Sequence, residues 1–161
     1  MGIFDKDPQR HFEGMSFTVT RTLFDPPALS MLPAVYVDDG AQLWAVRLPS
    51  ARPRILRFSD IVRAEVVEDD GEQDRQRLAE AGRKRLAKTL LNPKAISKAN
   101  AAKKGRMCFG LGVAVAVRNS DAPIQITFVT RAIRKDSAAY AQLHAAAESL
   151  RLEFEEMAKK G

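Results

Sequence analysis

Apolar and polar residues alternate in several short runs along the chain, and this is the pattern of half-buried β-strands. Proline, glycine and acidic residues interrupt the runs at positions where turns are expected. Residues 1–14 show no such period, so we expect them to form a flexible lead-in to the fold. The alternation predicts seven strands, at residues 17–23, 35–37, 43–48, 54–58, 61–68, 107–118 and 123–130.

The turns and faces of these strands can be predicted in more detail. Asp38-Asp39-Gly40 predicts a tight hairpin, because Asp-Gly suits the positive φ angles of such turns. Ser59-Asp60 predicts a further turn. The residues expected to face the core are Phe17, Val19 and Leu23 in the first strand, Val62, Ala64 and Val66 in the fifth, and Ile124, Ile126 and Phe128 in the seventh. The sixth strand is apolar on both faces, with Leu111, Val113, Val115 and Val117 on one and Gly110, Gly112, Ala114 and Ala116 on the other.

The period changes from two to about 3.6 near the end of the chain, and this change predicts one long amphipathic helix. Asp136 or Ser137 is expected to cap its N-terminus, and Lys159-Lys160 suits the C-terminal end of the helix dipole. We interpret the apolar stripe as the face that closes the core, with a coiled-coil seam as the alternative. The stripe consists of Tyr140, Leu143, Ala147, Leu150, Phe154 and Met157.

This order of elements predicts an α+β fold in which the helix covers one open side of a bent sheet or partly open barrel of about seven mostly antiparallel strands. Three phrases of the sequence resemble bacterial pleckstrin-homology-like (PH-like) domains of uncharacterised proteins, including the DUF4428-type family. The phrases are Val35-Tyr36-Val37-Asp38, Ile55-Leu56-Arg57-Phe58-Ser59-Asp60-Ile61 and Glu65-Val66-Val67-Glu68. The resemblance implies one PH-like domain over residues 15–161, interrupted by an insertion at 72–106.

Members of that family are similar to this chain in their first residues, Met-Gly-hydrophobic-Phe-Asp-Lys, which a cysteine-rich zinc knuckle then follows. No cysteine follows this start here, so the resemblance implies no zinc site in this chain. The wider PH resemblance implies inositol phosphate binding only where the loop between the first two strands is basic. Residues 24–33 contain no Lys or Arg, so that specificity is not expected.

The basic charge of the chain is concentrated in residues 72–106. This segment contains eleven Lys and Arg against three Asp and Glu, a net charge of +8, whereas the whole chain carries +6. Its spacing predicts one helix over residues 73–91, a break at Asn92-Pro93, and a second helix that ends near Lys104. The candidate residues for an anionic partner are Arg77, Arg83, Lys84, Arg85, Lys88, Lys94, Lys98, Lys103 and Lys104.

Three interpretations of this insertion remain open. It is a solvated appendage, it binds an anionic membrane surface, or it binds nucleic acid. The segment has no aromatic residue, which disfavours stacking on unpaired bases. A second basic group, Arg47, Arg52, Arg54 and Arg57, is interpreted as surface charge that keeps the protein in solution, because strand alternation should direct its members apart.

The sequence predicts no catalytic centre, cofactor or metal site. His11 and His144 have no partner at the spacing of a metal site or a nucleophile pair. The single cysteine, Cys108, is interpreted as a small core residue. We therefore expect a non-catalytic interaction module with an unknown partner, most simply another protein, and with anionic membrane or nucleic acid as the alternative. A homo-oligomer is also possible, because the small apolar face of the sixth strand could pack against a second copy of the chain.

Localisation is predicted from two features of the sequence. No apolar stretch approaches the roughly 18 to 20 residues of a spanning helix, and Asp5, Asp7 and Arg10 stand where a signal peptide would be apolar. We expect a cytoplasmic protein, with peripheral attachment to the inner face of the membrane as an option.

Overall fold

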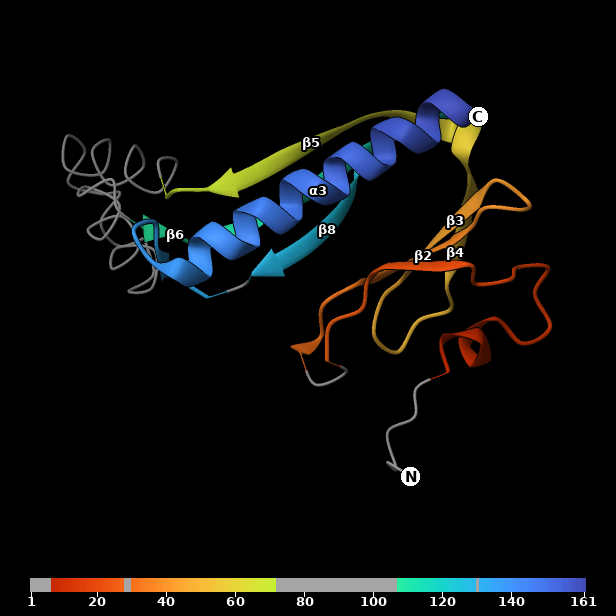
Figure 1. Cartoon of the computed structure of the whole chain (residues 1–161), viewed down its shortest axis with the longest axis horizontal. Helices are drawn as coiled ribbons and strands as arrows, with labels where there is room; N and C mark the ends of the chain where they lie inside the picture. The colour runs from red at the N-terminus through yellow and green to blue at the C-terminus, as the bar shows by residue number, and fades with distance from the viewer. Residues whose placement is uncertain (1–6, 28–29, 72–106, 130) are drawn as a thin grey trace, which may run out of the picture. The chain divides into compact units, whose positions relative to one another are not determined.

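The computed structural model describes residues 7–27, 30–71, 107–129 and 131–161 (Figure 1). The chain divides into two compact units. The first unit comprises Met1–Glu65, Val113–Ile126 and Ser149–Gly161, and the second comprises Val66–Gly112 and Thr127–Glu148.

The first unit is built on a four-stranded antiparallel sheet. Its strands follow the chain order and are β1 (Arg21–Phe24), β2 (Ala34–Asp38), β3 (Leu43–Arg47) and β4 (Arg54–Arg57). Tyr36 lies opposite Ala45, which lies opposite Ile55. Every residue of β2 is buried, because both faces of this sheet are covered.

The N-terminal segment covers one face of the sheet. A 3-10 helix, η1 (Pro8–Phe12), carries Phe12, which is 1% exposed. The Phe12 ring stacks on Phe17 at 4.4 Å and meets the edge of Tyr36 at 5.5 Å. The expected flexible lead-in therefore differs from the structure over these residues, since Phe12 is part of the core.

Side chains replace a neighbouring strand along residues 17–19. The Gln9 amide donates to Phe17 O and accepts from Val19 N, both at 2.8 Å, and Thr18 N donates to Asp38 at 2.9 Å. This accounts for the difference between the predicted strand, which began at residue 17, and β1, which begins at Arg21.

The C-terminal end of α3 (Ala138–Lys160) covers the other face of the same sheet. The Phe154 ring lies 4.9 Å from Trp44 at an interplanar angle of 76°. The predicted helical stripe is confirmed: Ala147, Leu150, Phe154 and Met157 are buried, and Tyr140 and Leu143 are half-buried.

The hairpin between β2 and β3 is confirmed, but its turn differs from the prediction. Asp38 pairs with Leu43, so the loop has four residues, and the positive φ falls on Gln42 (55°) and not on Gly40. The buried carboxylate of Asp38 closes the loop by accepting a hydrogen bond from Ala41 N at 3.0 Å. The acidic residue therefore acts through its side chain, where the sequence pattern suggested a glycine conformation.

The predicted turn at Ser59-Asp60 is a 3-10 helix, η3 (Phe58–Asp60), which leads into a second sheet. That sheet contains β5 (Ile61–Asp69), β7 (Gly110–Val117) and β8 (Ile124–Val129), in the order β5-β7-β8. A further pair is formed by β6 (Met107–Cys108) and β9 (Ile133–Arg134). The predicted strand at 107–118 is thus divided in two at Phe109.

The alternation predicted the buried face of β7 and β8 but was only partly right for β5, where Ala64 is buried and Val66 is half-buried. Leu111, Val113, Val115 and Val117 are buried and Ala114 is 9% exposed, so the expectation of two apolar faces is confirmed. In β8, Ile126 and Phe128 are buried as expected. The prediction for Val62 was wrong, since it is 60% exposed while Ile61 and Ala64 are buried. The burial of this strand does not follow a strict period of two.

The described residues form an α+β fold with several antiparallel sheets and one C-terminal helix. They contain nine strands where seven were predicted, since β9 was missed and one predicted strand became β6 and β7. Two residues are too few for a periodic signal, which is why β9 was missed. The described strands do not close into a barrel.

Candidate functional site

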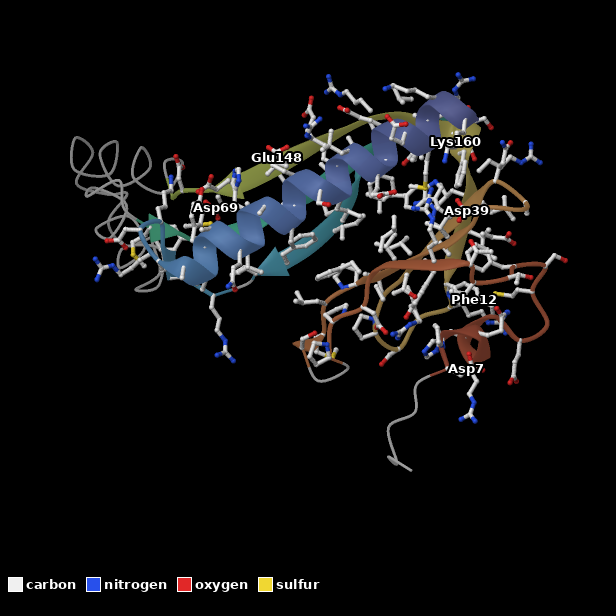
Figure 2. All side chains as sticks on the ribbon, viewed as in Figure 1. Asp7, Phe12, Asp39, Asp69, Glu148 and Lys160 are labelled. Atoms are coloured by element: carbon white, nitrogen blue, oxygen red, sulfur yellow. The ribbon has the colours of Figure 1, made fainter. Side chains whose placement is uncertain are left out.

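The clearest candidate site is the place where residues 72–106 leave the fold and return to it. In the second unit, β5 ends at Asp69 and β6 begins at Met107 (Figure 2 labels Asp69). Asp69 O accepts a hydrogen bond from Phe109 N at 2.7 Å. A Cβ atom at Gly110 would lie 3.5 Å from the Cβ of Asp69. The residues that flank the basic segment, Asp69 on one side and Phe109–Gly110 on the other, therefore lie side by side.

The nine basic residues predicted to meet an anionic partner all lie outside the described residues. They are Arg77, Arg83, Lys84, Arg85, Lys88, Lys94, Lys98, Lys103 and Lys104. What the structure adds is the identity of the residues that anchor their segment.

Glu68 is the centre of a polar cluster beside this anchor. Its carboxylate accepts from the Tyr140 hydroxyl at 3.2 and 3.3 Å and pairs with Lys135 Nζ at 3.3 Å. Burial, together with the charge of Glu68, raises the pKa of Tyr140. Burial is the largest single influence on the Lys135 amine and opposes its charge, but the hydrogen bond to Glu68 and the negative charges around the amine together outweigh it and raise its pKa. At neutral pH the phenol is therefore neutral and the amine charged, so neither group is a base.

Cys108 lies in the same unit and is fully buried, which confirms its interpretation as a core residue. Its thiol donates a weak hydrogen bond to Gly110 O at 3.3 Å. Burial raises the pKa of the thiol, so it is protonated at neutral pH. A reactive cysteine needs the opposite shift, because the thiolate is the nucleophile.

The N-terminal cap of α3 lies in the sequence between Lys135 and Tyr140, the two residues that contact Glu68. Of the two predicted caps, Ser137 serves: its Oγ accepts from Tyr140 N at 3.2 Å. Asp136 instead pairs with Arg134 at 2.6 Å. His144 lies one helical turn further, with its ring 5.7 Å from that of Tyr140. Within the ranges that the structure describes, no group of three or more His, Cys, Asp or Glu residues is placed to hold a metal ion.

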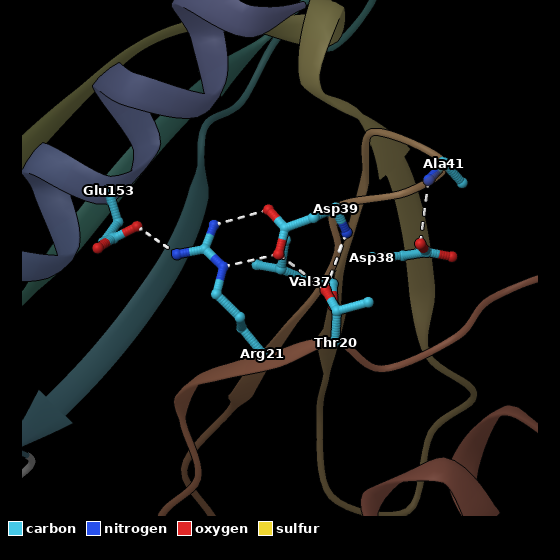
Figure 3. Close-up of polar contacts among 7 residues, drawn as sticks. All are labelled: Thr20, Arg21, Val37, Asp38, Asp39, Ala41 and Glu153. Atoms are coloured by element: carbon cyan, nitrogen blue, oxygen red, sulfur yellow. Dashed lines mark hydrogen bonds and ion pairs between the residues drawn. The ribbon is translucent and has the colours of Figure 1, made fainter.

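A second polar network, in the first unit, was not found from the sequence. Arg21 binds both oxygens of Asp39, at 2.8 and 3.0 Å, and also Glu153 at 2.8 Å (Figure 3). Asp39 also accepts from the Thr20 hydroxyl at 2.8 Å. The hydrogen bond from Arg21 lowers the pKa of Asp39. The network joins β1, the hairpin loop and α3, which are far apart in the sequence, so no local pattern indicated it.

The second basic group is divided by the register of its sheet, as the alternation predicted. Arg47 lies opposite Ala34 and Arg54 opposite Val46, and neighbouring residues of β3 point to opposite faces. Arg57 pairs with Leu43 at the other end of the sheet. These arginines do not form one patch.

Comparisons of the chain with protein-family models, with curated proteins and with solved structures found no match. In the described part of the chain, no helix has the length and apolar character needed to cross a membrane.

Proposed function

We propose that the protein is a non-catalytic, PH-like interaction module that acts in the cytoplasm and binds an acidic protein surface through residues 72–106. The observation that carries this proposal is the anchor described above, in which a hydrogen bond between Asp69 and Phe109 joins the residues on either side of the segment. A net charge of +8 is thus attached to the fold at a single place. This arrangement suits a segment that is presented to a partner.

The composition of the segment favours a protein over a lipid or a nucleic acid. It contains no Phe, Tyr or Trp, which anchor amphipathic segments in a bilayer interface and stack on unpaired bases. Contact with an acidic protein surface requires only complementary charge, which also accelerates association.

A membrane or nucleic acid is the second candidate, because the same charge supports it. Several Lys and Arg near an acidic leaflet contribute about 1 kcal/mol each. Binding to phosphates would instead fall steeply as the salt concentration rises, since counterions are released.

The chemistry of the described residues supports a binding role over a catalytic one. The Cys108 thiol and the Tyr140 phenol have raised pKa values. Both groups are therefore protonated near neutral pH, and the Glu68 carboxylate is engaged by Lys135 and Tyr140.

The test uses the full chain and two variants. In the first variant a short Gly/Ser linker replaces residues 72–106, which the Asp69–Phe109 hydrogen bond makes feasible. In the second, glutamine replaces Arg83, Lys84, Arg85 and Lys88, so that charge is removed while helix propensity is kept. Proteins are captured from the source cells on each chain, and binding to phosphatidylserine vesicles and to duplex DNA is measured at low and at physiological salt.

We expect one acidic protein to be captured by the intact chain and lost from both variants. Binding to vesicles or DNA that both variants lose, without such a protein, would assign the segment to the second candidate. If neither variant differs from the intact chain in any of the three assays, the segment is a solvated appendage and the proposal is wrong.

A further inference from the structure

Two loops meet at one end of the four-stranded sheet in the first unit. One joins β1 to β2, and the other, residues 48–53, joins β3 to β4. Ala34 lies opposite Arg47 and Val46 opposite Arg54, so both loops leave adjacent strands at the same end. The β2–β3 turn lies at the opposite end of these strands (Figure 1). We call residues 30–33 together with residues 47–54 the loop end.

The loop end exposes two large apolar side chains. Met31 is 67% exposed and Leu48 is 52% exposed. Each loop contains a backbone hydrogen bond: Ser30 N donates to Pro27 O at 2.9 Å, and Ala51 N donates to Leu48 O at 3.2 Å.

Backbone strain accompanies this exposure. Met31 has a φ of 57° and Ser50 a φ of 61°, which is the left-handed region that costs about 1 kcal/mol or more for residues other than glycine. Folding alone gains nothing from a strained, solvent-exposed methionine, so the exposure favours a role for the surface.

The charge of the loop end is positive. Arg52 and Arg54 are exposed, and neither Lys nor Glu occurs in either loop. The nearby acidic residue Asp25 already accepts from the Tyr36 hydroxyl at 3.4 Å. The exposed guanidinium groups of Arg52 and Arg54 are complementary to carboxylate oxygens.

We propose that the loop end is a docking surface for an acidic protein segment that packs an apolar side chain against Met31 and Leu48. Arginine and methionine are enriched in protein interfaces whereas lysine is depleted, and the loop end shows this composition. The loops lack Trp, Tyr and Lys, the residues that commonly anchor proteins at a bilayer surface. Residues 72–106 are not part of the loop end. The present proposal therefore goes beyond the function proposed above and does not depend on it.

The test is selection of random dodecapeptides displayed on phage against the immobilised full chain. Counter-selection uses the double variant Met31→Asn/Leu48→Gln, in which Asn is chosen because it tolerates a positive φ. Selected peptides are synthesised, and their dissociation constants are measured by fluorescence anisotropy. A second double variant, Arg52→Gln/Arg54→Gln, tests the charge.

The matched control is Val62→Thr/Leu152→Gln, which removes the other two exposed large apolar side chains of the first unit. We expect the selection to yield acidic peptides that contain a bulky apolar residue. Each loop-end variant should bind these peptides about tenfold more weakly than the intact chain does, which is the effect of losing an interface hot spot. The control and the chain with the Gly/Ser linker should bind within about twofold of the intact chain, since such changes lie outside the interface.

Failure to enrich any peptide, or equal affinity of the loop-end variants and the intact chain, would overturn the inference. Peptides whose binding is lost only in the chain with the Gly/Ser linker bind through residues 72–106. That result would also overturn the inference, while it would support the earlier proposal. Binding to phosphatidylserine vesicles that requires Met31 and Leu48, without peptide enrichment, would assign the surface to a bilayer and reject a protein segment. Unfolding midpoints in urea establish that each variant is folded.

Discussion

The sheet of the first unit and the anchor of residues 72–106 in the second unit are stabilised in different ways. The sheet is buried on both faces, where Phe12 and Tyr36 pack on one side and Trp44 and Phe154 on the other. The anchor instead depends on a backbone hydrogen bond and on the partly exposed Glu68 cluster. Apolar burial contributes more than exposed polar pairs, so we expect the sheet to set the stability of the fold.

The first unit's sheet can therefore be called the scaffold, and the Asp69–Phe109 hydrogen bond with the Glu68 cluster the attachment of residues 72–106. Contacts between partly exposed polar groups can open locally at a lower free energy than a buried apolar core. The predictions below test the separation, beginning with the change expected to have the largest effect.

Phe154→Ala should lower the free energy of unfolding by about 3 to 5 kcal/mol, because it removes a fully buried ring and leaves a cavity beside Trp44. Urea denaturation followed by tryptophan fluorescence measures it. Leu152→Ala, on the exposed side of the same helix, is the matched control and should cost less than about 1 kcal/mol. Equal effects of the two changes would show that α3 does not cover this sheet.

Gln9→Ala should cost about 1 to 3 kcal/mol, since Phe17 O and Val19 N would lose their partners in a partly buried position. Gln9→Glu is the informative control, because a carboxylate accepts from Val19 N but cannot donate to Phe17 O. In urea denaturation, the free energy of unfolding of Gln9→Glu should lie between that of the intact chain and that of Gln9→Ala. A neutral Gln9→Ala would mean that the N-terminal segment contributes little to the core.

Stability should decrease at alkaline pH. The Cys108 thiol and the Tyr36 phenol have raised pKa values because of burial, so the unfolded chain ionises first. Their contribution is complete below the unfolded pKa values, about 8.5 and 10, and is lost as the pH rises through the folded values. Urea midpoints measured from pH 7 to about pH 11 test this.

Cys108→Ala should remove the earlier part of that decrease, near pH 9, and leave the part due to tyrosine. An unchanged profile in this variant would mean that the thiol ionises equally well in the folded and unfolded chains.

Tyr140→Phe should have the smallest effect, at most about 1 kcal/mol, because only an exposed hydrogen bond to Glu68 is lost. Hydrogen exchange of the Phe109 amide provides a local measurement. We expect faster exchange there in Tyr140→Phe with an unchanged urea midpoint. A midpoint lowered as far as in Phe154→Ala would contradict the separation of scaffold and attachment.

Periodic patterns predicted much of the fold. The stripe from Ala147 to Met157 and the buried face of β7 were readable because each is a long run with one period. Gln9 was not readable, since a side-chain amide that replaces a strand leaves no periodic signal. The position of Val62 was missed because the burial of β5 departs from strict alternation.

Of the candidate site, only the position of the basic segment between two strands was predictable from the sequence. Charge counting found the basic segment, and strand prediction indicated that its ends meet. The Glu68 cluster and the Arg21 network join residues distant in sequence, and such contacts depend on tertiary packing. The loop end was missed for a related reason, because exposure of Met31 and Leu48 depends on loop conformation and not on composition.

The hydrogen bond between Asp69 and Phe109 has a consequence for how this protein can change over evolutionary time. Each doubling of the length of a connection costs only about 0.6 kcal/mol of closure entropy when its ends are already adjacent. A change in the length of residues 72–106 should therefore cost little closure entropy. The number of basic residues between the two strands can then change at little entropic cost, while Asp69 and Phe109 keep their hydrogen bond.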